Sequence, residues 1–378
     1  MKEYGQMAVR LMKDMVKFDT SNAPGNERPL AEYIADILRQ EGFEIEVQVV
    51  AENRANMIAS FGQSDRNLIL NGHLDVVPPG SGWNCAPFCV TEKEGRFYGR
   101  GTCDMKGGLA AMMAAAIKVK RENTLKNKNL VLAFVADEEI NGTGTKYFAR
   151  HFEKGKQNIV VIGEPTQNQI HVAHRGVVRL VVGIYGKQCH SGRPYEGMNA
   201  LTLLGRFLVE VEGWNQRKQK LIQPILPPPT VAATIAAGGI KDNVIPGYGE
   251  VVLDFRTVPG DTAKQLELET EAVLKRLFET EDVSWIIETY IDVAPGMTDP
   301  EADSVKIAQM AYERMGRPKP GIAYFSAGCD LSCFLSEGFD GILCGPGSLA
   351  QAHVVDEYIE GRQLEEAVDF YESYILSM

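Results

Sequence analysis

Residues 67–75 read Asn-Leu-Ile-Leu-Asn-Gly-His-Leu-Asp, an apolar run that ends in a segment containing His73 and Asp75. Such a short apolar run, followed by glycine and polar residues, predicts a buried strand. His73 and Asp75 are two residues apart, so on an extended segment their side chains point to the same side. The carboxylate of Asp75 could then hold the second ring nitrogen of His73, which would fix the tautomer and strengthen the imidazole as a ligand. Taken alone, the segment could equally be a polar loop after a strand.

Further residues that can bind metal ions or protons occur along the chain, most of them after apolar runs. They are Asp104, the adjacent Glu138 and Glu139, Glu164 and His353. Residues 130–136 precede the glutamate pair, and residues 159–162 precede Glu164. Because open α/β sheets place their sites at the carboxyl ends of strands, we expect these side chains to converge there.

The expected set mixes carboxylate oxygens with two imidazoles, a combination that suits zinc, cobalt or manganese. It holds too many ligands for one tetrahedral ion, which indicates two metal ions. Glu138 and Glu139 are adjacent, so their side chains point in different directions, and one can bind metal while the other transfers protons. Singly, each position has a plainer interpretation: Asp104 as a helix N-cap, the glutamate pair as a solvated turn, and His353 as part of a surface loop.

The composition bounds the class of protein. The chain has 378 residues, which suggests two domains, and its 44% hydrophobic and 24% charged residues are typical of a globular protein. The formal charge of −11, without a Lys/Arg cluster, argues against nucleic acid and anionic membranes as partners. The first residues lack a signal-peptide signature, and no apolar run reaches the roughly 18 residues that span a bilayer. Seven cysteines without paired spacing favour reduced thiols, so we expect a cytoplasmic location.

Helical and strand-like patterns alternate in the first third of the chain. The spacing of apolar residues predicts helices over 4–18, 29–41 and 107–121, and strands over 44–50, 57–61 and 68–71. This alternation predicts an α/β fold with a mixed, mostly parallel sheet sandwiched by helices.

The pattern changes after Arg175-Gly176. The order there is strand 177–185, helix 199–212, strands 230–237 and 250–256, helix 262–278 and strand 283–293. This β-α-β-β-α-β order is that of ferredoxin-like α+β domains. Helix-strand alternation resumes after Pro295-Gly296, in the part of the chain that contains His353. We therefore expect a discontinuous catalytic domain, 1–175 and 296–378, with an inserted domain at 176–295.

The remaining histidines have more ordinary interpretations. His151 lies at a charged helix end, and His171 and His174 lie in a strand-and-hinge segment, which favours solvated or structural roles. His190, in a loop of the inserted domain, is either an ordinary surface residue or a mobile donor delivered to an active site. Cys103 has no base spaced to activate its thiol and is interpreted as a packing residue.

Together, these motifs resemble the dinuclear zinc amidohydrolases, a family that includes acetylornithine deacetylase, succinyl-diaminopimelate desuccinylase, carboxypeptidase G and aminoacylase. The resemblance extends from Asp19-Thr20-Ser21-Asn22, through Gly-Arg-Gly-Thr-Cys-Asp-Met-Lys-Gly-Gly at 99–108, to the last helix. The tail at 345–353, followed by Asp356-Glu357-Tyr358, looks most like the acetylornithine deacetylase branch. Residues 325–330 match the Gly-Thr-Ser-Asp-Gly signature of the desuccinylases clearly only at Asp330, which argues against succinyl specificity.

The resemblance implies a role for each motif residue. His73 and Glu164 would bind one metal ion, most often zinc, Glu139 and His353 would bind the other, and Asp104 would bridge the two. Glu138 would be the general base, Asp75 would support His73, and the bond between Asp104 and Met105 would be a cis peptide.

For the inserted domain, the resemblance implies a lid and a homodimerisation surface. His190 would come from this domain, in the same chain or across a dimer, to stabilise the tetrahedral oxyanion. Asn243 and Arg256 would grip a carboxylate of the substrate, a task that suits the planar fork of arginine. The alternative for Arg256 is a surface charge on a strand.

The function that the resemblance implies is metal-dependent hydrolysis of the amide bond of an N-acyl amino acid. The expected substrate is N-acetylornithine or a similar N-acetyl amino acid, which would place the enzyme in arginine or other amino-acid biosynthesis. A dipeptidase or carboxypeptidase with the same metal site, or a desuccinylase, are the alternatives. A non-catalytic binding protein is disfavoured because Glu138 and every ligand position are present. The glycines at 99–108 do not form the fingerprint of a dinucleotide-binding oxidoreductase.

Overall fold

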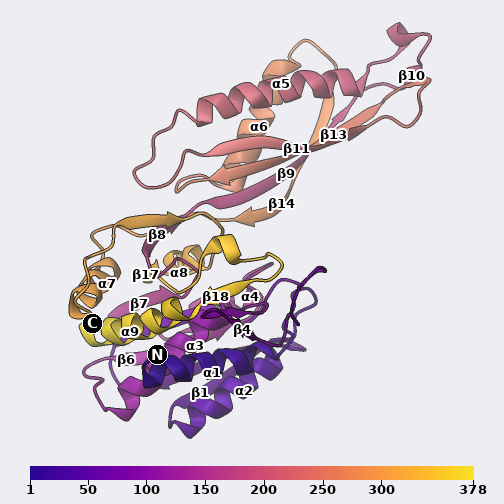
Figure 1. Cartoon of the computed structure of the whole chain (residues 1–378). Helices are drawn as coiled ribbons and strands as arrows, with labels where there is room; N and C mark the ends of the chain where they lie inside the picture. Colours follow the sequence, from indigo (N-terminus) through magenta and orange to yellow (C-terminus); the bar gives the residue numbers. More distant parts are fainter. The chain divides into compact units, whose positions relative to one another are not determined.

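A computed structural model describes residues 1–378, which form two compact units (Figure 1). Unit 1 comprises Met1–Val172, Met297–Phe325 and Cys329–Met378, and unit 2 comprises Ala173–Gly296 and Ser326–Gly328. Unit 2 therefore interrupts unit 1 in the sequence, and both chain ends belong to unit 1. The observed boundaries follow residues 172 and 296, where the sequence suggested boundaries after 175 and 295. The short return of residues 326–328 to unit 2 was not expected.

The large sheet has the strand order β1-β2-β6-β3-β7-β17-β8-β15, with β16 paired to β8. Its strands are β1 (Glu44–Ala51), β2 (Arg54–Phe61), β3 (Arg66–His73), β6 (Asn129–Val135), β7 (Gln157–Ile162), β8 (Ile170–His174), β15 (Gly296–Met297), β16 (Ile322–Phe325) and β17 (Asp340–Leu343). The sheet is mixed, as predicted, but it is less parallel than expected. The central strands β6, β3, β7 and β17 pair parallel, while β1 with β2, β2 with β6 and β8 with β17 pair antiparallel. Only two residues join β1 to β2, and such a short turn permits only antiparallel pairing.

Helices flank this sheet on both faces. They are α1 (Glu3–Val16), α2 (Arg28–Gln40), α3 (Lys106–Arg121), α4 (Thr143–His151), α7 (Asp303–Arg314), α8 (Leu331–Ser336) and α9 (Gly361–Ser377). Side chains alternate along β3. A Cβ at Gly72 would lie 2.6 Å from the Leu109 side chain, so this face of β3 is covered by α3, whereas Asn67 points to the face where α4 packs. The alanine-rich α3 is buried nearly throughout because α1 and α9 pack against its outer side.

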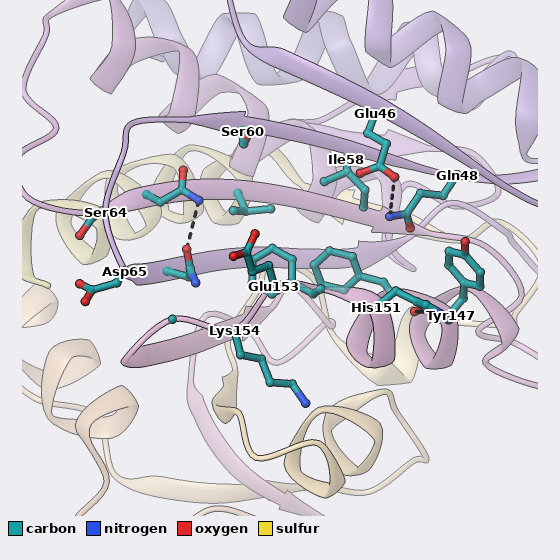
Figure 2. Close-up of a pocket in the computed structure, with 16 residues that line it drawn as sticks. Glu46, Gln48, Ile58, Ser60, Ser64, Asp65, Tyr147, His151, Glu153 and Lys154 are labelled. Atoms are coloured by element: carbon teal, nitrogen blue, oxygen red, sulfur yellow. Dashed lines mark hydrogen bonds between the residues drawn. The ribbon is translucent and has the colours of Figure 1, made fainter.

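The face of the sheet beside α4 is hollowed (Figure 2). The hollow has a volume of about 590 Å³ and is floored by side chains of β1, β2, β3 and β6, including Glu46, Ile58 and Ser60. Tyr147 and His151 of α4 line its side. Asn67 and Asn129 stand at the starts of the parallel strands β3 and β6. The hollow therefore lies at the opposite end of these strands from the predicted site.

A small antiparallel sheet connects two segments that are distant in the sequence. It consists of β4 (Thr91–Lys93), β5 (Arg96–Tyr98) and β18 (Tyr358–Glu360), in the order β18-β5-β4. This pairing, which the sequence patterns did not predict, brings the residues before β18 next to the glycine-rich segment that contains Asp104.

Unit 2 has the β-α-β-β-α-β order predicted for a ferredoxin-like domain. Its elements are β9 (Gly176–Tyr185), α5 (Ala200–Lys218), β11 (Thr230–Gly238), β13 (Tyr248–Thr257), α6 (Ala263–Leu277) and β14 (Ser284–Val293). The antiparallel sheet has the order β11-β13-β9-β14, and its buried face packs with α5 and α6 around residues such as Phe207 and Leu274. A two-stranded ladder of β10 (Cys189–His190) and β12 (Val244–Ile245) completes the unit.

None of the helices in either unit is long and apolar enough to cross a membrane.

Candidate metal centre

Three neighbouring parallel strands end next to each other in unit 1. His73 is the last residue of β3, which lies between β6 and β7, and it is in register with Val135 at the end of β6. Glu138 and Glu139 follow β6, and Glu164 follows β7. Because the strands are parallel, their carboxyl ends meet at one edge of the sheet, and the predicted side chains gather there.

The first group of metal-ligand type, the buried triad, consists of His73, Asp104 and Glu164. Nε2 of His73 lies 3.0 Å from Oδ1 of Asp104 and 3.9 Å from Oε1 of Glu164. Their side chains are 1%, 8% and 5% exposed, so the three ligand atoms are almost sealed from solvent.

The second group, the open triad, consists of Asp104, Glu139 and His353. Nε2 of His353 lies 3.2 Å from Oδ2 of Asp104 and 3.1 Å from Oε1 of Glu139. The His353 side chain is 50% exposed, and its backbone has a positive φ of 61°. Asp104 belongs to both triads, with one carboxylate oxygen directed to each histidine. This is the arrangement of a bridging carboxylate.

The charges of the two triads fit divalent cations. Burial and the neighbouring carboxylates raise the pKa of Glu164 well above its usual range. Burial likewise raises the pKa of Glu139, although a hydrogen bond from His353 opposes this. Burial disfavours a charged His73, yet the Asp104 carboxylate beside it holds its pKa well above the ordinary value. Buried carboxylates crowded together in this way are a donor set that positive ions would satisfy, and two imidazoles with several carboxylates suit two ions better than one.

Glu138 lies beside the two triads and belongs to neither. Burial raises its pKa well above the ordinary value, and the carboxylates of Glu164 and Asp330 add to this effect, while a charged His73 opposes it. Asp330 was noted in the sequence only as one position of a family signature. It is 4% exposed, its pKa is raised to about 6 by burial, and it accepts a hydrogen bond from the Thr145 hydroxyl.

Asp75 supports the site differently from the sequence prediction. Nδ1 of His73 hydrogen bonds to the main-chain oxygen of Asp75 at 2.9 Å, while the Asp75 carboxylate is 3.8 Å from this nitrogen. The main-chain carbonyl therefore fixes the tautomer of His73. The carboxylate instead accepts hydrogen bonds from the main-chain N–H groups of Glu138 (3.1 Å) and Glu139 (3.2 Å). The spacing of His73 and Asp75 predicts that both side chains lie on one side of the segment, but it does not predict this competing main-chain acceptor.

A second buried carboxylate, Glu357, holds the segment of Asp104 in the same way. Its Oε1 accepts the main-chain N–H groups of Cys103 (2.8 Å) and Asp104 (3.0 Å), and its Oε2 accepts a 2.6 Å hydrogen bond from Arg100. In the sequence, Glu357 is recognisable only as part of a tail motif. Its sequence neighbours, Asp356 and Tyr358, do not indicate that it holds main-chain N–H groups of a distant segment. The peptide bond between Asp104 and Met105 is cis, as the resemblance implies.

The predicted residues of unit 2 lie within that unit at two places. His190 is exposed in β10, and the main-chain N–H of Ser191 beside it hydrogen bonds to the Asn243 carbonyl at 3.0 Å. Arg256 projects from β13, where its Nε donates to Asp254 at 2.9 Å. The ladder of β10 and β12 thus brings His190 and Asn243 together, and Arg256 lies on the four-stranded sheet.

The other histidines are outside both triads. His151 is exposed at the end of α4 and hydrogen bonds to the Tyr147 carbonyl. His171 and His174 lie in β8, and burial lowers the pKa of each to about 4. Neither belongs to a group of metal-ligand type, which agrees with their structural interpretation.

Comparison with known proteins identifies the family. The pattern of peptidase family M20/M25/M40 matches residues 69–377, which include both triads. The chain belongs to peptidase family M20. This M20 protein is therefore a hydrolase of a family that acts on amide bonds.

Curated relatives of this M20 protein are named as enzymes for different substrates. It is 30% identical to a probable succinyl-diaminopimelate desuccinylase of Staphylococcus epidermidis, over 97% of this chain and 96% of the relative. It is also 30% identical to an acetylornithine deacetylase of Pasteurella multocida, over 92% and 89% of the two chains. Among solved structures, a Bacillus subtilis protein described as a dinuclear metal binding peptidase of the M20 family superposes with a TM-score of 0.76, at 15% identity over 99% of this chain and 98% of the other. The last similarity shows the fold.

Proposed function

We propose that this M20 hydrolase binds two divalent metal ions in its two triads and hydrolyses the amide bond of an N-acyl amino acid, most simply N-acetylornithine or a similar N-acetyl amino acid. The observation that supports this most directly is the position of Asp104, whose two carboxylate oxygens lie 3.0 Å and 3.2 Å from His73 and His353. Family membership and the deacetylase relative point in the same direction.

In this proposal, His73 and Glu164 hold one ion, Glu139 and His353 hold the other, and Asp104 is shared. Zinc is the first choice, and cobalt or manganese suit the same oxygen and nitrogen ligands. When bound, such ions would lower the pKa of water and polarise the amide carbonyl.

Glu138 is proposed as the general base because it lies next to the triads without belonging to either. Its carboxylate would accept a proton from the attacking water and donate it to the departing amine nitrogen, so that one water and one amide become a carboxylic acid and an amine. The main-chain N–H of Glu138 is fixed by Asp75, which limits how far this carboxylate can move.

A substitution of Glu138 tests the base directly. We expect Glu138→Gln to lower kcat by roughly 10²–10⁴-fold while the metal content stays at two ions per chain. Glu153→Gln, which changes an exposed glutamate of the hollow beside α4, is the matched control. Near wild-type turnover by the Glu138→Gln variant with metal bound would refute the assignment.

The substrate is addressed by comparing kcat/KM for a panel of amides. N-acetylornithine, neutral N-acetyl amino acids, N-succinyl amino acids and dipeptides separate the proposed deacetylase from a desuccinylase and from a peptidase. We expect the N-acetyl compounds to be preferred, because residues 325–330 match the desuccinylase signature clearly only at Asp330. A preference for dipeptides by tenfold or more would favour the peptidase alternative.

Unit 2 is proposed to supply the groups that recognise the substrate. His190 would stabilise the oxyanion, in the same chain or across a dimer, and Asn243 and Arg256 would bind a substrate carboxylate. The Arg256 guanidinium is held by Asp254 through Nε alone, which leaves its terminal nitrogens for another acceptor. We expect His190→Ala to lower kcat mainly, and Arg256→Lys to raise KM mainly.

A homodimer through unit 2 is part of the same proposal. β11 is the outer strand of the four-stranded sheet, and residues 232–238 of it are exposed. An exposed edge strand can pair with another chain. Light scattering of wild type and of an Ile235→Lys variant tests this, since a charge on the edge should give a monomer if β11 is the interface.

A further inference from the structure

The adjacent glutamates Glu138 and Glu139 are held by a buried polar network outside the two triads. The carboxylate of Asp75 accepts the main-chain N–H groups of both glutamates. The side-chain amide of Asn22 donates to Oδ2 of Asp75 at 2.8 Å and to Oδ1 of Asp137 at 3.1 Å. Asp137 directly precedes the glutamates in the chain. The side-chain amide of Asn22 therefore bridges Asp75 and Asp137. Asp75 is linked to the glutamate pair by hydrogen bonds, and Asp137 is linked to it by the peptide chain.

Arg54 anchors the far side of this network. Its Nη1 lies 2.9 Å from Oδ1 of Asp137, and its Nη2 and Nε donate to Glu27 at 2.6 Å and 3.0 Å. Glu27 is fully buried and Asp137 is 2% exposed. Because an arginine fork binds two carboxylates in fixed directions, Arg54 ties Asp137 to the N-terminal end of α2.

The orientation of the Asn22 amide is set by its neighbours. Asn22 is 4% exposed, and its carbonyl oxygen has no hydrogen-bond partner. The reversed amide would direct that oxygen at the two carboxylates of Asp75 and Asp137, which are acceptors themselves. The side-chain N–H₂ of Asn22 therefore bridges the two buried carboxylates, one of which also pairs with Arg54.

We propose that Asn22, anchored through Asp137 by Arg54, is a positioning residue that sets the placement of the Glu138–Glu139 pair. It touches no reacting atom, and it acts through Asp75 and Asp137. The inference rests on the proposed function for its kinetic consequences. The network holds Glu139 of the open triad and the proposed base Glu138 through their main-chain N–H groups. It reaches the buried triad only through the main-chain oxygen of Asp75, which accepts from His73 and to which Asn22 makes no hydrogen bond.

The test compares two buried asparagines in metal-free protein titrated with Co²⁺. Asn22→Leu removes the amide donor at similar volume. Asn67→Leu is the matched control. Asn67 is also 4% exposed, it donates to the side chain of Asn158, and it lies at the end of β3 away from the triads. We expect the half-exposed open triad to be the weaker Co²⁺ site and the almost sealed buried triad the stronger one. Asn22→Leu should weaken the weaker site by roughly 10–100-fold, as loss of a supporting hydrogen bond does at metal sites, and change the stronger site by less than about threefold. Asn67→Leu should leave both Co²⁺ affinities unchanged.

Kinetics provide a second readout. With both sites saturated with metal, Asn22→Leu should lower kcat by about tenfold or more and change KM by less than about threefold, because the proposed base shifts while the substrate contacts remain. A purely structural role would instead give Asn22→Leu and Asn67→Leu the same loss of melting temperature, with wild-type Co²⁺ affinities and kcat in both. That result would overturn the proposal.

A milder variant keeps the test decisive if Asn22→Leu does not fold. The exposed residue Thr143 donates its hydroxyl to Oδ2 of Asp137, and Thr289 of unit 2 donates in the same way to Glu267. We expect Thr143→Val to weaken the weaker Co²⁺ site by about threefold and Thr289→Val to leave it unchanged. Equal behaviour of these two variants would count against the network.

The Co²⁺ titration also separates this inference from the proposed function. A wild-type protein that hydrolyses no amide, but whose weaker Co²⁺ site is lost in Asn22→Leu, would refute the function and leave the positioning role supported. A wild-type enzyme that is active, with an Asn22→Leu variant that binds both Co²⁺ ions normally, would refute the positioning role alone.

Discussion

The two triads share Asp104 but differ in how the rest of the fold surrounds them. In the buried triad, His73 ends β3 and Glu164 comes shortly after the adjacent strand β7, and their side chains are 1% and 5% exposed. In the open triad, His353 comes from a loop before β18, and half of its side chain is exposed. One triad is built on the sheet itself, and the other is completed by a loop.

This difference has consequences for how the two sites would bind metal. Ligands on rigid strand ends lose little freedom when an ion binds, whereas an exposed histidine on a loop must be ordered at that moment. Water also reaches the open triad more easily. We therefore expect the buried triad to bind its ion more tightly and the open triad to exchange its ion faster.

The largest effect is expected where the two triads meet. Asp104→Asn replaces the shared carboxylate and should remove both ions, with a loss of kcat/KM of more than roughly a thousandfold, or about 4 kcal/mol of transition-state stabilisation. Elemental analysis of the purified variant measures the metal content. Asp65→Asn, which alters an exposed carboxylate paired with Lys156, should keep both ions and full activity. Retention of two ions by Asp104→Asn would show that Asp104 is not shared.

The next largest effect separates the triads from each other. His73→Ala should lose the tighter ion and also lower the free energy of unfolding of the metal-free protein by about 2–5 kcal/mol, because it leaves a cavity in a sealed site and removes the partner of Oδ1 of Asp104. His353→Ala should lose only the weaker ion, with a much smaller change in stability, because its side chain is half exposed. Denaturant unfolding with chelator measures the stability, and equal losses in the two variants would contradict the comparison.

Metal binding at the open triad should depend on pH. In metal-free protein, hydrogen bonds to Asp104 and Glu139 raise the pKa of His353 to about 10. Its folded pKa lies above the ordinary value of 6.5, so this contribution to stability is complete below pH 6.5 and is lost as the pH rises through about 10. A cation must displace the same proton, so the affinity of the open triad should increase with pH over this range.

Calorimetry in buffers of different ionisation enthalpy measures this proton release. At pH 7, saturation with metal should release about one proton from His353 in the wild type, and His353→Ala, which keeps only the ion of the buried triad, should release fewer protons per chain by at least that one. An unchanged proton release in the variant would mean that another group supplies it.

The sequence predicted much of the fold and of the candidate site because both depend on local patterns. The strand before His73 was predicted over 68–71 and extends over Arg66–His73, and the helix after Asp104 was predicted over 107–121 and begins at Lys106. Ligand-type residues directly after apolar runs could be expected to converge, since parallel strands end at one edge. The order of elements in unit 2 was predictable for the same reason, because each helix and strand has its own apolar period.

The supporting residues could not be predicted because their roles depend on distant parts of the chain. Asn22, Arg54 and Glu357 follow no apolar run of their own, and each acts through a partner at least 53 residues away or through a main-chain N–H group. The Asp75 carboxylate illustrates the limit. Its spacing from His73 was read correctly, yet its hydrogen bonds go to Glu138 and Glu139 because a main-chain carbonyl already occupies Nδ1. Which of two nearby acceptors is used is decided by tertiary geometry.

The smallest effect is expected at Cys103, which lies beside Asp104 and could be mistaken for a fourth ligand of the buried triad. Its Sγ donates to the Ser348 carbonyl at 3.3 Å, and burial raises its pKa well above the usual range, so the thiol stays protonated. Cys103→Ala should therefore cost only about 0.5–1.5 kcal/mol of stability and change kcat by less than about twofold. The Co²⁺-loaded wild type should show no thiolate-to-metal absorption band, because only a deprotonated cysteine binds metal. Such a band, if it disappeared in Cys103→Ala, would show that Cys103 is a fourth ligand of the buried triad. The two sites would then no longer have the same kinds of ligand, and their difference could not be attributed to burial alone.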